Sequence, residues 1–119
     1  MTLDEFISSR LKGKLWPRNA YVTEPGFSSL YVRVTVRYID GQMRGPVLDL
    51  ASLEAETPGK GTFTQLISRL RKDWPQLGLF VECVVNPRLP RKLVELGFTH
   101  TGPQCYWMPP VKETRHEPS

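Results

Sequence analysis

The feature that most restricts the fold of this chain is an apolar strand, a glycine-containing turn and an amphipathic helix in direct succession. Residues 47–53 are mostly apolar, which is typical of a central strand covered on both faces. Residues 58–62 form the turn, and residues 63–74 carry apolar side chains at helical spacing. A second apolar stretch follows at 79–85. Because a helix connects the two strands, we expect them to be parallel.

The other elements are indicated by local chemistry. Thr2 and Glu5 form a capping-box pattern before a first helix. Residues 30–39 alternate β-branched or aromatic residues with arginine and threonine, and Asp40-Gly41 predicts a hairpin to the strand at 47–53. We expect a short strand at 21–23, a short helix at 89–96 and strands at 98–101 and 105–108. The pattern predicts an α/β (α+β) fold with a mixed sheet.

Length and composition place the chain in a broad class. A chain of 119 residues fits one domain, expected over 1–108, with a disordered tail at 109–119. No apolar run is long enough to span a bilayer, and Asp4 and Glu5 interrupt any signal peptide, so we expect a cytoplasmic protein without a membrane partner. The net charge is +4, but the basic residues are scattered, so we do not expect a nucleic-acid partner. Cys83 and Cys105 are expected as thiols, and no metal site is indicated.

The turn at Gly59-Lys60-Gly61 is the clearest candidate for ligand binding. Glycine allows the backbone to approach a ligand closely, and a helix N-terminus presents free N–H groups that favour phosphate. The P-loop and the dinucleotide fingerprint are both excluded, because Glu54 and Thr64 stand where each would require a glycine. The alternative is an ordinary strand-to-helix turn whose glycines serve geometry alone.

Several segments together resemble the motifs of a known family. The stretch Leu53-Glu-Ala-Glu-Thr-Pro-Gly-Lys-Gly-Thr-Phe-Thr-Gln-Leu-Ile resembles the acetyl-CoA motif of the GNAT N-acetyltransferases. Asn86 at a strand end, Leu96-Gly97-Phe98 and the closing aromatic strand at 105–108 also resemble this family in order and spacing. The resemblance covers about half the chain. It implies a mixed, partly splayed sheet with helices on both faces.

The resemblance also implies an activity, the transfer of an acetyl group from acetyl-CoA to an amine. The acceptor would be a small molecule or a protein, which the sequence does not identify. The pyrophosphate would lie over the backbone amides of the turn, and the backbone near Leu53 would pair with the pantetheine arm. The implied cofactor-binding residues are Leu53, Gly59, Lys60, Gly61, Thr62, Phe63 and Asn86.

Two residues are candidates for the chemistry. Glu82 is a carboxylate inside an otherwise apolar strand, and burial would raise its pKa toward that of a useful base. An ion pair with one of the many arginines is an equally good explanation of its position. Tyr106 is the candidate acid for the departing thiolate, with a core aromatic as the alternative. Asp49 is a weaker candidate of the same kind as Glu82.

Two departures from the family pattern are consistent with a different function. Glu56 stands where the turn ordinarily begins with Arg or Gln, and Leu93 stands where many members have a tyrosine. Both favour a non-catalytic GNAT-like binding module. A small basic nucleic-acid-binding protein is a third hypothesis, and binding of acetyl-CoA would argue against it.

Overall fold

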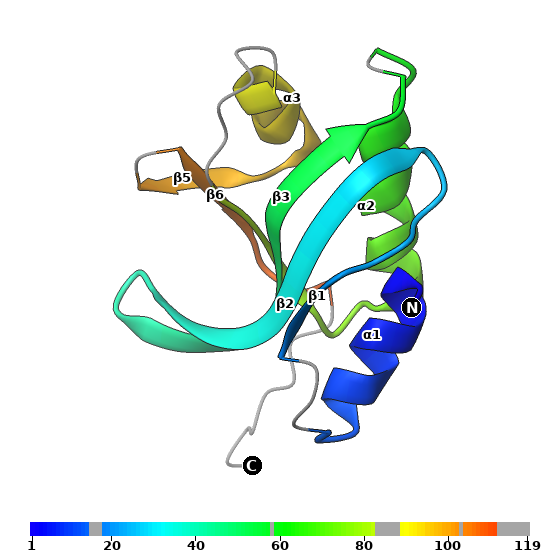
Figure 1. Ribbon diagram of the computed structural model, residues 1–119. Coiled ribbons are helices and arrows are strands. Elements are labelled where there is room, and N and C mark those ends of the chain that lie inside the picture. Colours follow the sequence, from blue (N-terminus) through cyan, green and yellow to red (C-terminus); the bar gives the residue numbers. More distant parts are fainter. Residues whose placement is uncertain (15–17, 58, 83–88, 103, 112–119) are drawn as a thin grey trace.

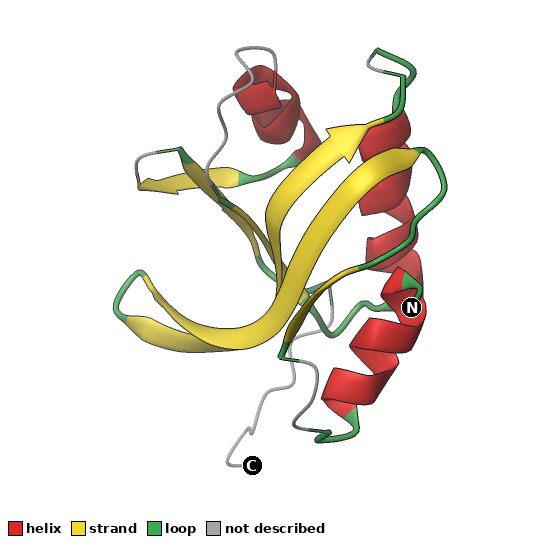
Figure 2. Cartoon of the chain, in the orientation of Figure 1, coloured by secondary structure: helices red, strands yellow, loops and turns green. Residues whose placement is uncertain are grey.

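A computed structural model describes residues 1–14, 18–57, 59–82, 89–102 and 104–111. In these ranges the fold is a six-stranded mixed sheet with three helices, which confirms the predicted α/β class (Figures 1 and 2). The elements are α1 (Leu3–Leu11), β1 (Asn19–Tyr21), β2 (Phe27–Ile39), β3 (Gln42–Ala55), α2 (Thr62–Asp73), β4 (Gly78–Val81), α3 (Leu89–Leu96), β5 (Thr99–Gly102) and β6 (Cys105–Met108).

The strands lie in the order β1-β2-β3-β4-β6-β5. Strands β3 and β4 are parallel, as the intervening helix α2 requires, and all other neighbours are antiparallel. The register of the parallel pair runs from Val47 opposite Gly78 to Leu50 opposite Val81. The sheet therefore has one parallel pair near its centre, flanked by antiparallel strands.

Local sequence signals account for several boundaries. The Thr2 side chain accepts a hydrogen bond from the Glu5 amide, and the Glu5 side chain accepts one from the Thr2 amide, so the capping box is formed. Asp40 and Gly41 have φ values of 52° and 78°, and Ile39 pairs with Gln42 around this two-residue turn. The strand expected at 79–85 ends at Val81 in β4, and its remainder at 83–85 lies outside the described residues.

The buried side chains form two clusters, one on each face of the sheet. The main cluster joins the inner faces of the helices to alternate strand residues such as Leu48, Leu50 and Val81. The second contains Ile39, Val47, Phe80 and Trp107. Figure 1 shows α2 above α1 on the same side of the long strands β2 and β3.

The packing does not confirm the expected placement of helices on both faces. Among the described residues, every buried helix side chain belongs to the main cluster, and the second cluster contains strand residues only. The second face carries charged side chains beside this small apolar cluster. No helix within the described ranges is long and apolar enough to cross a membrane.

Candidate functional site

The glycine turn before α2 has the backbone geometry that only glycine adopts readily. Gly59 and Gly61 have φ values of 84° and 73°, and Gly61 is the N-cap of α2. A Cβ at either position would meet nothing within 4 Å, so the space beside both residues is open. Lys60 is exposed. Among the described residues α2 has no side-chain cap, and its first turn has no acidic residue, so the Thr62 and Phe63 amides face a site that favours an anion.

Strand β3 continues toward this turn past the end of its pairing with β4. The last register pair is Leu50 with Val81, and the Glu82 amide reaches the Leu50 carbonyl at 3.4 Å. Leu53 still pairs with Leu30 of β2 on the other side, and its half-buried side chain packs against the main cluster. In the described part of the chain, the β4-facing edge of β3 therefore has no strand partner beyond this point.

Four charged side chains form an ion cluster on the second face of the sheet. Arg33 donates from Nε to Asp49 Oδ2 at 2.8 Å and from Nη2 to Glu82 Oε1 at 2.6 Å. Arg37 donates from Nη2 to Glu82 Oε2 at 2.6 Å and also to Asp49 Oδ2. The antiparallel strands β2 and β3 and the residue after β4 thus supply two arginines and two carboxylates.

The charged groups of the ion cluster differ in burial and in the direction in which their pKa values shift. Asp49 is fully buried, whereas the Arg33 side chain is 37% exposed. Burial and the neighbouring Asp49 carboxylate raise the pKa of Glu82 above its ordinary value, while Arg33 and Arg37 oppose that rise. The hydrogen bond that Arg33 donates to Asp49 raises the pKa of Arg33, which keeps this guanidinium charged. Glu82 therefore combines the direction of shift expected of a base with the arginine ion pairs that were its alternative explanation.

Tyr106 lies on the other side of the sheet from the ion cluster. It is buried in the main cluster, and its register partner on β4 is Val81, which belongs to the same cluster. Its ring stacks on His100, with the ring centroids 5.0 Å apart. The structure does not bring Tyr106 together with Glu82. Asn86, the other residue expected near the cofactor, lies outside the described residues.

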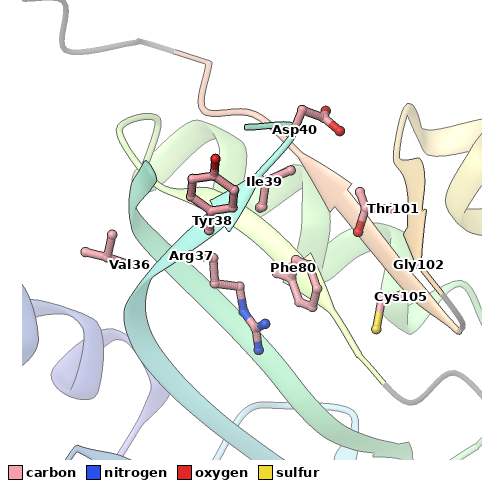
Figure 3. Close-up of a pocket in the computed structure, with 9 residues that line it drawn as sticks. All are labelled: Val36, Arg37, Tyr38, Ile39, Asp40, Phe80, Thr101, Gly102 and Cys105. Carbon is pink, nitrogen blue, oxygen red and sulfur yellow. The ribbon is translucent and has the colours of Figure 1, made fainter. Parts of the chain in front are cut away.

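A pocket of about 430 Å³ adjoins the ion cluster on the same face. Figure 3 shows Arg37 and Phe80 at its centre, with Thr101 and Cys105 on the side of the β5–β6 hairpin. The guanidinium carbon of Arg37 lies 4.0 Å from the centroid of the Phe80 ring. The turn between β2 and β3, including Asp40, forms the opposite side of the pocket. One side chain, Arg37, therefore links the pocket to Glu82.

Sequence reasoning missed the arginines of the ion cluster and the pocket beside them. A signal for the arginines was present, because Arg33 and Arg37 are four positions apart in a strand and an even offset puts both side chains on one face. Asp49 and Glu82 were candidate residues, and the predicted hairpin placed the strand of Asp49 beside residues 30–39, but the sequence did not indicate which arginine each carboxylate contacts. No group of three or more potential metal ligands occurs within the described ranges.

No protein-family model, curated protein or solved structure matches this chain.

Proposed function

We propose that this protein is a GNAT-like N-acyltransferase that transfers an acetyl group from acetyl-CoA to an amine. The observation that carries the proposal is the turn of Gly59 and Gly61, left-handed and open, at the N-terminus of α2. Its backbone amides suit a pyrophosphate, and the turn directly follows the strand edge near Leu53 that could pair with an extended amide-bearing arm. The cofactor would thus use backbone groups at both points.

The strand arrangement supports the same proposal. A parallel pair joined by a helix, followed by a short helix and an antiparallel hairpin, agrees with the order that the GNAT resemblance implies. Ligands of sheets with parallel strands characteristically bind at the carboxyl ends of those strands. The end of β3 and the residue after β4, Glu82, lie at this point of the fold.

The chemistry proposed for the site is an acyl transfer with one proton removed and one returned. The acceptor nitrogen attacks the thioester carbonyl carbon, the C–S bond breaks, and CoA departs as a thiolate that is then protonated. Glu82 is the group proposed to take the amine proton, since burial and Asp49 raise its pKa. Tyr106 receives no role in this proposal, because its ring is buried on the other face.

A non-catalytic module that binds acetyl-CoA is the second candidate. The observation that favours it is the pairing of Glu82 with both Arg33 and Arg37, which would have to loosen for proton transfer. Leu93, at the position where many family members have a tyrosine, is fully buried in the main cluster. Both candidates share the cofactor site, so the first test concerns binding.

Isothermal titration calorimetry with acetyl-CoA tests the site. Gly61→Val should lose at least about tenfold in affinity, because a β-branched residue cannot easily keep the left-handed turn. Gly13→Val is the matched control, since Gly13 also has a positive φ of 82° with nothing near its Cβ. Equal affinities in the two variants, or no binding by the parent protein, would exclude this cofactor site. Release of free thiol with a panel of amines then separates the enzyme from the binding module.

A further inference from the structure

Arg37 lines the pocket on the second face and has more N–H donors than the ion cluster uses. A single nitrogen of Arg37, Nη2, makes the contacts to both Asp49 and Glu82. A guanidinium group has five N–H donors in a planar fork. The Nε of Arg37 is buried and has no partner among the described residues, and an unpaired buried donor is costly. This Nε is too buried to meet a ligand, but Nη1 of Arg37 also has no hydrogen bond among the described residues, and Arg37 lines the pocket, so a ligand there could accept from Nη1.

Arg33 makes the carboxylates less dependent on Arg37. It donates separately to Asp49 and to Glu82, at 2.8 and 2.6 Å. If a ligand draws the Arg37 guanidinium toward the pocket, both carboxylates keep one charged partner. Arg37 can therefore share its charge with a ligand, through nitrogens other than Nη2, while Arg33 keeps both carboxylates paired.

Arg44 adds positive charge beside Arg37, although its own side chain does not line the pocket. It stands directly opposite Arg37 in the β2–β3 register, so its side chain leaves the hairpin on the same face. Its Nε is buried without a partner, and within the described ranges Arg44 makes no ion pair. An anion beside Arg37 would thus lie near a second cation that the fold has not neutralised.

The remaining lining groups distinguish between kinds of anion. Asp40 lines the pocket, and Asp49 and Glu82 lie behind Arg37, so a doubly charged phosphate would be repelled. A carboxylate carries one charge and matches the planar fork of arginine. The walls formed by Ile39 and Phe80 are apolar, and about 430 Å³ leaves room for a side chain as well.

We propose that this pocket receives the acyl acceptor and selects amines that carry a carboxylate on the neighbouring carbon, as α-amino acids do. The inference rests on the proposed function. A carboxylate held by Arg37 places its adjacent amino group close to Glu82, because Glu82 contacts the same guanidinium at 2.6 Å. Arg37 thereby recognises the acceptor, and Glu82 receives the proton that the amine loses as the amide bond forms and the thioester breaks.

Binding is tested first, without acetyl-CoA, through the thiol in the pocket wall. N-acetyl-L-phenylalanine should slow alkylation of Cys105 by iodoacetamide, followed by mass spectrometry at that cysteine, and its carboxamide should not. Arg37→Gln and Arg44→Gln should each weaken the protection about tenfold or more. Arg91→Gln, at a 90% exposed side chain, should keep it. Arg44→Gln decides the matter if Arg37→Gln does not fold. Equal protection by acid and amide, or none by the acid, would overturn the inference.

Turnover is tested next, with L-phenylalanine, L-phenylalaninamide, phenethylamine and O-phosphoethanolamine as acceptors. The amino acid should be acetylated at least about tenfold faster than the others. A protein that binds acetyl-CoA but prefers phenethylamine or the phosphate ester refutes the acceptor assignment and leaves the proposed function intact. A protein that does not bind acetyl-CoA refutes the proposed function, while protection of Cys105 would still show a carboxylate site.

Discussion

Arg33 and Glu82 are 49 positions apart in the sequence, yet Arg33 Nη2 lies 2.6 Å from Glu82 Oε1. The contact spans strand β3, from β2 on one side to the residue after β4 on the other. It passes close to Asp49, a fully buried carboxylate whose Oδ2 accepts from Arg33 and Arg37. The ion cluster therefore joins the antiparallel and parallel parts of the sheet through side chains as well as through the backbone ladder.

Replacing Arg33 should test how much the ion cluster contributes to the stability of the fold. Arg33→Gln removes one of two cations beside a fully buried carboxylate, and we expect the free energy of unfolding to fall by about 2–4 kcal/mol. Arg91→Gln, at a 90% exposed side chain, should change it by less than about 0.5 kcal/mol. Urea denaturation at neutral pH measures both. Similar small losses in the two variants would show that Asp49 does not depend on Arg33.

The raised pKa of Glu82 predicts a slope in stability against pH. A carboxyl group whose pKa is higher in the folded state binds more protons when folded, so its contribution is complete below the ordinary value of 4.5 and is lost as pH rises through the folded pKa. Urea denaturation between about pH 4 and pH 8 should show this decline, and Glu82→Gln should flatten it. Glu95→Gln, at an exposed site, should leave the decline unchanged. A parent protein without the decline contradicts the shift.

Asp4 predicts the opposite slope at lower pH. Burial acts to raise the pKa of Asp4, but hydrogen bonds from Trp74 and Arg69 lower this pKa below its ordinary value of 3.8. Its stabilising contribution is therefore present above that value and is lost as pH falls through the folded pKa. Asp4→Asn should remove this acid sensitivity in thermal unfolding. Trp74→Phe should move the Asp4 pKa back toward 3.8 in an NMR titration, and an unmoved titration would exclude the Trp74 contribution.

Gly78 is expected to be required for packing rather than for backbone freedom. A Cβ at Gly78 would overlap the ring of Trp107, which is only 4% exposed. Gly78→Ala should therefore destabilise the protein by about 1–3 kcal/mol and alter the near-UV circular dichroism of the buried indole. Gly102→Ala is the control, because nothing lies within 4 Å of the added atom. Matching stabilities for the two variants would show that the indole moves freely.

The sequence predicts those parts of the fold whose causes are local. The spacing of apolar residues predicted α2, and the Asp40-Gly41 pair predicted the hairpin, because both depend on neighbouring residues. The ion cluster depends on register instead. Between Thr35 and Arg37 the register of β2 against β3 shifts, and no local pattern states which residue of β3 then faces which arginine. The candidate phosphate turn could therefore be predicted from the sequence, whereas the pocket beside Arg37 could not.

The position of β6 between β4 and β5 has a consequence for the order of synthesis. Strand β4 is complete at Val81, but its antiparallel neighbour does not exist until Met108 has been translated. Until Met108 pairs, Leu79, Phe80 and Val81 present an apolar strand with one free edge, which is the kind of surface that attracts other chains. We expect nascent chains arrested on a C-terminal linker to aggregate most when Val81 has left the exit tunnel and Met108 has not, and to stop aggregating once Met108 can pair.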